Sequence, residues 1–315
     1  MDAYLRLLES EGRAAHSIRD TRYRDAAFIR PTLGNTKIVN VTADILRHWR
    51  DELVRVPPRL RTSKHAAQRH HRPTESRDAQ RARRATANRT WTILRAALNH
   101  AFQDGKVESD LAWRKVRPFK NVDAARIRYL TVAEAKRLIN ASAPEFRLLV
   151  QAALQTGCRF GELARLTVSD FNPDAGTVAI RQSKTGRARH VVLTDEGARF
   201  FREACAGRLG SEPMLIKDNG TSWDKSHQGR CIAEAVKRAK ITPTINFHGL
   251  RHTWASLAVM AGVPIMVVAR NLGHVDTRMV EKHYGHLAPS YISEAIRKGA
   301  PRFGFKPTRA VVPIR

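Results

Sequence analysis

Residues 177–193 read TVAIRQSKTGRARHVVL, and they interrupt a chain whose apolar residues otherwise recur at helical spacing. Apolar and polar side chains alternate at each end of this stretch, which is the period of a strand with one buried face; the apolar ones are Val178, Ile180, Val191 and Leu193. The segment between them contains Gly186, a residue suited to a tight connection. We therefore predict one short β-hairpin inside a mainly helical chain.

Helices are predicted on both sides of this hairpin. Thr131 and Glu134 have the spacing of a capping box, and the helix at 146–154 that follows is ended by Gly157. After the hairpin, helical spacing recurs at 195–207, 226–240, 248–261, 264–271, 277–287 and near 290–298. We therefore predict that residues 129–300 form one domain, mostly helical with a small antiparallel β-sheet, followed by a basic tail at 301–315.

The N-terminal part is predicted to be all helical. A helix begins near Tyr4, a second is stopped by Pro31 and Gly34, a third runs from Thr42 to Pro57, and a long one covers about 85–104. Residues 59–84 nearly lack apolar side chains and contain nine Lys or Arg, which indicates a solvated basic loop or a DNA-contacting segment. We predict a helical domain at 1–115, joined by a linker at 116–128 to the second domain.

The net charge of the chain indicates the kind of molecule that it binds. The 315 residues, enough for two domains, include 56 Lys and Arg against 29 Asp and Glu, a formal net charge of +27. Residues 1–128 contain 28 basic and 14 acidic side chains, and 129–315 contain 28 and 15, so the excess of +14 and +13 is shared. Such an excess favours a polyanionic partner. A passive nucleic-acid binder remains an alternative on composition alone.

Cysteine and histidine patterns do not indicate a metal site. Cys158, Cys205 and Cys231 are widely spaced and odd in number, which fits neither a disulfide framework nor a zinc motif. The histidines lack acidic or thiol companions at ligand spacing. Since there is neither an apolar run of roughly 18 residues nor a secretory signal at the N-terminus, we expect a cytoplasmic protein with reduced cysteines.

Several motifs of the second domain carry groups suited to phosphate chemistry. In chain order they are TGCRFGEL at 156–163, Lys184, HGLRH at 248–252, LGH at 272–274 and HYGH at 283–286. Together these motifs resemble the tyrosine recombinase, or phage integrase, family over residues 129–290. Residues 1–128 resemble the helical core-binding domain of the same family. The resemblance implies a two-domain DNA clamp.

The residue types suit the chemistry. Phosphodiester transfer places negative charge on phosphate oxygens, and Arg159 and Arg251 provide planar, permanently charged forks for them. His248 and Arg251 lie three residues apart near a helix start, so they share one face. Glu162 either orients an arginine or His248, or is an ordinary surface carboxylate.

Tyr284 has two interpretations. Val280 and Leu287 share its helical face, which is typical of a core tyrosine. As a nucleophile, a phenol with a pKa near 10 needs neighbouring cations or a base, and His274 and the arginines would provide them.

The resemblance implies specific roles for these residues. Tyr284 would attack DNA to form a 3′-phosphotyrosyl link, Arg159, Arg251 and His274 would stabilise the transition state, and His248 would assist proton transfer. Lys184 would be the general acid. Neither a metal nor another cofactor is expected.

The resemblance also implies the partners. Four protomers, a homotetramer, would act on two DNA duplexes through a Holliday junction, integrating or excising a mobile element such as a prophage or genomic island. We expect the protein on the nucleoid. Longer family members carry a further arm-binding domain, which we expect to be naturally absent here or truncated. The alternatives are a catalytically silent DNA-binding regulator with the same fold and a type IB topoisomerase-like activity.

Overall fold

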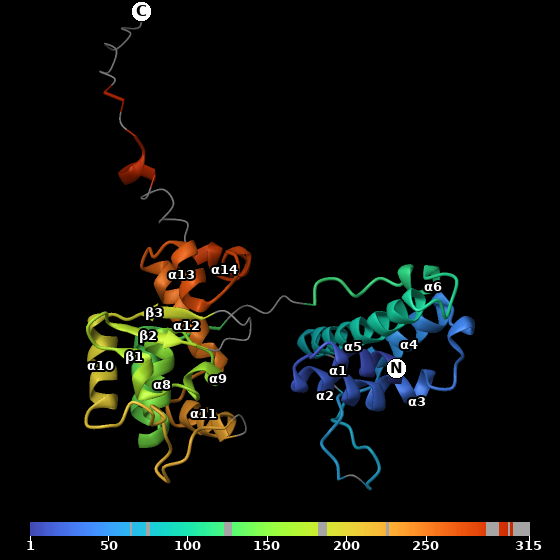
Figure 1. The fold of residues 1–315 in the computed structure, drawn as a ribbon, viewed down its shortest axis with the longest axis horizontal. Coiled ribbons are helices and arrows are strands. Elements are labelled where there is room, and N and C mark those ends of the chain that lie inside the picture. Colours follow the sequence, from blue (N-terminus) through green and yellow to red (C-terminus); the bar gives the residue numbers. More distant parts are fainter. Residues whose placement is uncertain are drawn as a thin grey trace, which may run out of the picture. The chain divides into compact units, whose positions relative to one another are not determined.

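The chain divides into two compact units, Met1–Ala125 and Arg126–Arg315, each described here by itself. The computed structural model describes residues 1–63, 65–73, 76–122, 128–181, 188–224, 227–287, 296–301 and 303–304. Both units are mainly helical, and the described strands form one small sheet in the second (Figure 1). The predicted fold class, mainly helical with a small antiparallel sheet, is confirmed. None of the helices in the described ranges is long and apolar enough to cross a membrane.

Unit 1 is built of helices around a tryptophan-rich core. Its elements are α1 (Asp2–Ser10), α2 (Ala15–Arg24), the π-helical turn η1 (Asp25–Ile29), α3 (Arg30–Leu33), the 3-10 turn η2 (Ile38–Asn40), α4 (Ala43–Arg55), α5 (Arg77–Gln103) and α6 (Leu111–Arg114). The indole rings of Trp49 on α4 and Trp91 on α5 lie 6.4 Å apart, and both side chains are buried. The predicted N-cap at Thr42 is confirmed, because its hydroxyl accepts the backbone N–H of Ile45.

The predicted stop at Pro31 and Gly34 is confirmed for Gly34 and wrong for Pro31. Helical backbone continues from α2 through η1 into α3 and ends at Gly34. A proline within a helix leaves an upstream carbonyl without its donor. Side chains supply donors here: Arg59 Nη1 donates to the carbonyl of Ala27 at 2.8 Å, and Trp49 Nε1 donates to that of Phe28 at 2.9 Å.

The long helix α5 begins at Arg77, eight residues before the predicted start near residue 85. Ser76 caps it by accepting the backbone N–H of Ala79 at 3.2 Å. Arginine, glutamine and alanine are good helix formers, so the first turns of α5 need no apolar stripe once the cap is present. The absence of apolar residues in 77–84 therefore did not indicate a loop.

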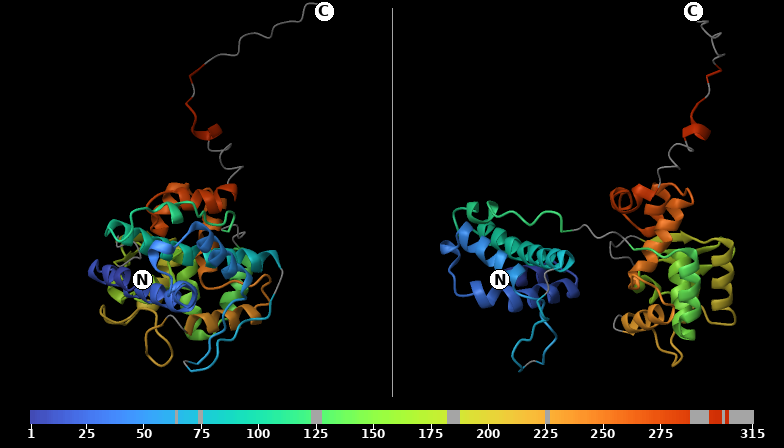
Figure 2. Two further views of the ribbon diagram at one scale, coloured as in Figure 1. Left: turned by 90° about the vertical axis from the view of Figure 1, so that its right-hand side faces the viewer. Right: turned by 180° about the vertical axis from the view of Figure 1, so that it is seen from behind.

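The rest of the basic segment forms an antiparallel projection, which we call the basic arm (residues 58–63 and 65–73). Backbone N–H groups of Leu60 and His71 donate to the carbonyls of Arg69 and Pro58 at 2.8 and 2.9 Å. The arm extends away from the helices of unit 1 (Figures 1 and 2).

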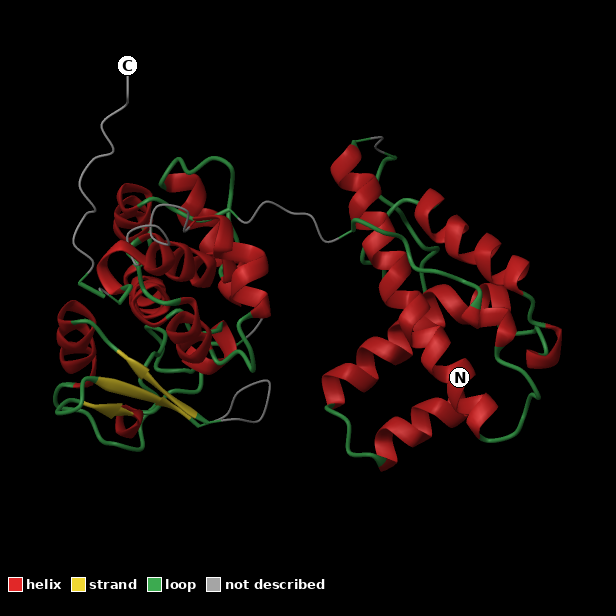
Figure 3. Cartoon of the chain, turned by 90° about the horizontal axis from the view of Figure 1, so that it is seen from above, coloured by secondary structure: helices red, strands yellow, loops and turns green. Residues whose placement is uncertain are grey.

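Unit 2 places one three-stranded sheet beside a group of helices (Figure 3). Its helices are α7 (Val132–Ala141), α8 (Pro144–Thr156), α9 (Phe160–Leu163), α10 (Asp195–Cys205), α11 (His227–Arg238), α12 (His248–Met260), α13 (Ile265–Leu272) and α14 (Arg278–Tyr284), with the 3-10 turns η3 (Val168–Asp170) and η4 (Gly285–Leu287). Its strands are β1 (Phe171–Asn172), β2 (Thr177–Ile180) and β3 (Arg189–Val192).

The sheet is antiparallel in the order β1-β2-β3, with Val178 opposite both Phe171 and Val191. The predicted strands at 178–180 and 191–193 are confirmed to within two residues, while β1 was not predicted. Residues 182–187 between β2 and β3, which include Lys184, lie outside the described residues, as do most residues of the helix predicted near 290–298.

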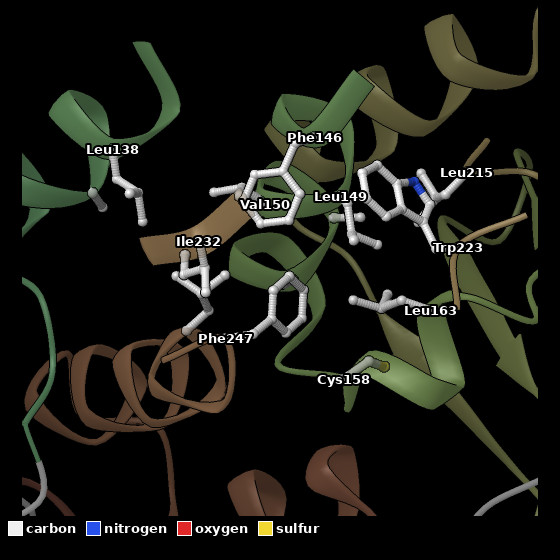
Figure 4. Close-up of a cluster of buried hydrophobic side chains, with 14 of the residues drawn as sticks. Leu138, Phe146, Leu149, Val150, Cys158, Leu163, Leu215, Trp223, Ile232 and Phe247 are labelled. Atoms are coloured by element: carbon white, nitrogen blue, oxygen red, sulfur yellow. The ribbon is translucent and has the colours of Figure 1, made fainter. Parts of the chain in front are cut away.

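Unit 2 contains two hydrophobic clusters. In the larger one, Phe146 of α8 lies with its ring 5.6 Å from that of Trp223 and 6.2 Å from that of Phe247 (Figure 4). The smaller cluster joins α12, α13 and α14 and includes Leu272 and Tyr284. The helices α13 and α14 lie together at the end of unit 2 opposite α11 (Figures 1 and 2).

Local signals for the first helices of unit 2 are confirmed. Thr131 and Glu134 form the capping box of α7, and Gly157 ends α8 with a left-handed backbone at φ +65°. A side chain at Gly157 would also collide with Trp254, because a Cβ there would lie 2.8 Å from the indole ring. Glycine is therefore needed for both its backbone conformation and its small volume.

Candidate active site

Arg251 is the best-anchored side chain of the site. It lies on the first turn of α12 and is only 4% exposed. Its guanidinium donates to the carbonyl of Gly157 at 3.0 Å and to that of Leu272 at 2.8 Å, and it lies 2.9 Å from Nε2 of His274. Burial, and then the positive charge of Arg159, lowers the pKa of Arg251 to about 10, so it stays a cation at neutral pH.

His274 is a neutral imidazole with a determined tautomer. An arginine can only donate, so Nε2 facing Arg251 must be the acceptor, and the ring proton must be on Nδ1. Burial, and then the charges of Arg251 and two further arginines, lowers the pKa of His274 to about 4. Its Nδ1 is buried and has no hydrogen-bond partner among the described residues. His274 therefore holds an N–H donor beside the guanidinium of Arg251.

Arg159 is held by a buried carboxylate. Glu162, with a side chain 2% exposed, accepts from Arg159 Nη1 at 3.0 Å and from Arg189 Nη2 at 2.8 Å. It also accepts the backbone N–H of Arg159 at 2.9 Å. Burial raises the pKa of Glu162, but the hydrogen bonds from Arg189 and Arg159 outweigh this and leave it below its ordinary value. The Arg159 side chain keeps 25% of its surface exposed, so it remains open to an anion.

His248 begins α12, in agreement with the helix predicted at 248–261. Loss of water around its ring, followed by the charges of Arg251 and Arg159, lowers the pKa of His248. The residue still has an exposed surface. Its ring lies 4.8 Å from that of His252, one helical turn further along, at an interplanar angle of 89°.

Tyr284 is the last residue of α14 and is 3% exposed. Its hydroxyl oxygen lies 2.5 Å from Nδ1 of His252. Burial raises the pKa of Tyr284 to about 12, although the charge of Arg251 acts in the opposite direction. The sequence predicted His274 and the arginines as the activating neighbours; the hydrogen-bond partner is instead His252, and the phenol is neutral in this structure.

The structure thus gathers five of the six predicted residues into one region. Arg251 contacts His274 directly, and the charge of Arg159 acts on His248, Arg251 and His274. Tyr284 joins them through His252. The predicted general acid Lys184 lies outside the described residues, as does Tyr291, the next tyrosine along the chain.

Two residues gained importance only from the structure. Arg189 was not among the predicted site residues, yet its side chain is 9% exposed, and besides Glu162 it donates to the carbonyl of Asn271 at 2.8 Å. Alternation along β3 was an available signal, because Arg189 shares a face with the buried Val191. For His252 the signal was its spacing of four from His248 on one helical face.

The cluster of cations beside a tyrosine agrees with a comparison to known families. The model of the phage integrase family matches residues 128–290, just over half of the chain. The chain belongs to the phage integrase family. Among curated relatives, the integrase of Salmonella phage P22 is 32% identical over 235 residues, which cover 70% of this chain and 58% of that protein. The chain spans less than 60% of the length of the first curated relatives of this integrase family that it matches.

Solved structures share the integrase fold. A lambda integrase dimer bound to a COC′ core site has a TM-score of 0.70 and 20% identity, with 88% of this chain and 94% of that chain covered. A lambda integrase tetramer bound to a Holliday junction has a TM-score of 0.71 and 20% identity, with 90% and 75% covered. At this level of identity the likeness shows the fold.

Proposed function

We propose that this integrase-family chain is a site-specific DNA recombinase that cuts and rejoins DNA through a 3′-phosphotyrosyl intermediate. The observation that carries the proposal is the meeting of Arg251, His274 and Arg159 in one cluster, in which the charge of Arg251 also acts on the phenol of Tyr284. Fixed cationic donors placed beforehand stabilise the charge that develops on a phosphate in transfer, because they need no reorganisation at that moment.

The proposed step exchanges one phosphodiester for another. The Tyr284 oxygen forms a bond to the scissile phosphorus, the bond from phosphorus to the 5′ oxygen breaks, and the phenol proton leaves with the assistance of His248. Arg159, Arg251 and His274 bind the non-bridging oxygens. The freed 5′ oxygen takes a proton from Lys184, the residue at the family's general-acid position. Reversal by a 5′-hydroxyl of the partner strand rejoins the DNA, so the bond energy is conserved.

His274 supports this proposal by its tautomer. Its Nδ1–H is a donor without a partner among the described residues, and unused buried donors are rare in folded proteins. A phosphate oxygen would satisfy it. Arg251, whose guanidinium is held by two backbone carbonyls, would then keep its position as the anion enters.

The partner we propose is double-stranded DNA carrying a recombination site. The lambda integrase assemblies, a dimer on a core site and a tetramer on a Holliday junction, support a homotetramer acting on two duplexes. We assign the 1–115 region to DNA binding and the 129–300 region to catalysis, joined by a linker at 116–128. In the cell the protein would act on the nucleoid, integrating or excising a mobile element.

A nicked duplex carrying the recombination site tests the nucleophile, because the short fragment released on cleavage diffuses away and the covalent adduct accumulates. Wild-type protein should form the adduct, and Tyr284→Phe should bind the same duplex without forming it. A persistent adduct in Tyr284→Phe would place the nucleophile elsewhere. Relaxation of supercoiled DNA without any recombination site would favour a topoisomerase, and binding without an adduct in wild type would favour a silent regulator.

A further inference from the structure

The hydrogen-bond partner of the Tyr284 hydroxyl is His252, which is not one of the six residues predicted from the sequence to be catalytic. His252 lies on α12 and Tyr284 on α14, and the 2.5 Å separation of Nδ1 and the phenol oxygen joins the two helices. Within the described residues, this is the hydrogen bond that the structure gives the phenol. The rings are 6.0 Å apart and inclined at 49°, so the contact is made by the polar atoms rather than by stacking.

The direction of this hydrogen bond follows from burial. Tyr284 is 3% exposed, and a buried O–H left without an acceptor costs about 1 to 3 kcal/mol. Nδ1 of His252 is the acceptor within reach, so it must carry the lone pair, and the ring proton must be on Nε2. The phenol therefore donates, and the imidazole accepts.

The surroundings of His252 keep it in this accepting form. The pKa of His252 is lowered to about 4, mainly because the ring is buried. The positive charges of His248, His283 and Arg251 lower it further. At neutral pH the ring is therefore uncharged. An imidazole whose cationic form is disfavoured in this way is a poor base for a phenol whose own pKa is raised to about 12.

We infer that His252 is a positioning residue for the nucleophile: as a neutral acceptor it fixes the O–H bond of Tyr284 toward α12 and leaves the oxygen lone pairs for the phosphate. This inference rests on the proposed recombinase function. It assigns His252 a hydrogen-bonding role and leaves the removal of the proton to other groups. Arg251 supports the geometry, since its charge acts on the same phenol.

Substitutions of His252 that replace one ring nitrogen at a time distinguish a positioning role from a role as general base. Asparagine at position 252 puts an amide oxygen near the site of Nδ1, whereas glutamine puts it near the site of Nε2, and neither amide is a base. We expect His252→Asn to form the covalent adduct within about threefold of the wild-type rate. His252→Ala and His252→Gln should be slower by about 100-fold, the loss expected for a reacting group misplaced by about 1 Å. DNA affinity should be unchanged in all three.

Two kinetic results would overturn the inference. If His252→Asn formed the covalent adduct as slowly as His252→Ala, His252 would be the base. The loss of a general base slows a reaction by roughly 10² to 10⁴-fold. If all three variants matched wild type, His252 would have no role in the covalent step.

A measurement on the DNA-free protein tests the contact without any activity. With ¹⁵N-labelled histidine, Nδ1 of His252 should show the NMR shift of an unprotonated nitrogen that accepts a hydrogen bond. In Tyr284→Phe that signal should move to the position of an unprotonated nitrogen without a donor. A protonated Nδ1, or a signal unaffected by Tyr284→Phe, would refute the inference. Failure of wild type to form the adduct would instead refute the proposed function, so the two failures are distinguishable.

Discussion

Replacement of Glu162 by glutamine tests the buried network behind the proposed phosphate site. From the described residues Glu162 accepts four hydrogen bonds: two from Arg189 at 2.8 and 3.2 Å, one from the Arg159 side chain at 3.0 Å and one from the Arg159 backbone at 2.9 Å. The amide of Glu162→Gln has one oxygen, so it keeps the two bonds made to one carboxylate oxygen. At the other position its NH₂ group faces donors.

The expected cost is about 3 to 5 kcal/mol of unfolding free energy, the usual result of removing one partner from a buried ion pair. The size of the effect depends on Arg189, because its side chain is 9% exposed and its charge would lose its carboxylate. Urea unfolding of the whole chain, followed by the hydrogen exchange of unit 2 backbone amides, measures it. Glu234→Gln is the matched control, since Glu234 pairs with Arg230 on the surface, where both side chains are more than half exposed.

The dependence on pH gives a second reading of the same variant. The pKa of Glu162 is lower in the folded state than its ordinary value of 4.5, so its contribution to stability is complete above pH 4.5 and is lost as the pH falls through the folded pKa. The difference between wild type and Glu162→Gln should therefore shrink below pH 4.5. A change as small as that of Glu234→Gln, whose pair lies on the surface, would refute the idea that Glu162 organises the two arginines.

Three further outcomes are expected. Gly157→Ala should destabilise unit 2 by more than the roughly 1 to 2 kcal/mol of left-handed strain, because its Cβ would meet Trp254 at 2.8 Å. Gly207→Ala, in the same unit with φ +68° and open space, should show the strain alone in the same urea assay, and equal losses would contradict the clash. Replacing the exposed arginines Arg61, Arg69 and Arg72 of the basic arm should reduce the slope of log affinity against log salt by up to about 2.7 in DNA titrations. An unchanged slope would show that the arm does not contact phosphates. The pKa values of His252 and His274 are both lowered to about 4, so between pH 4 and 6.5 the unfolded chain binds more protons than the folded chain. Stability should therefore fall as the pH drops through that range, and it should fall less steeply in His252→Asn. Parallel curves of stability against pH for the wild type and His252→Asn would contradict the lowered pKa of His252.

Signals carried by neighbouring residues predicted most of the elements. The capping box at Thr131 and the left-handed backbone that ends α8 at Gly157 each depend on residues within one turn, so the pattern was enough. The alternation in 177–193 reflects one buried face of a hairpin whose two strands are neighbours in the sequence. The same kind of reasoning was wrong at Pro31 and at the start of α5, where distant side chains or a single cap decided the outcome.

The identity of the phosphate-binding candidates was also available from the sequence, because Arg159, Arg251 and His274 are residue types whose chemistry is known before they are placed. Their arrangement was not available. Arg189 and Glu162 are 27 positions apart, and His252 and Tyr284 are 32 apart, so packing alone decides that they meet.

Local sequence thus determined the helices, the hairpin strands and the residue types of the site, since propensity, caps and periodicity act over one or two turns. Only the tertiary structure decided which charge is buried against which, and that the phenol of Tyr284 is neutral and hydrogen-bonded to His252. The physical reason is that burial and electrostatic fields depend on every element packed around a group, and a hydrogen bond depends on positions to within a few tenths of an ångström.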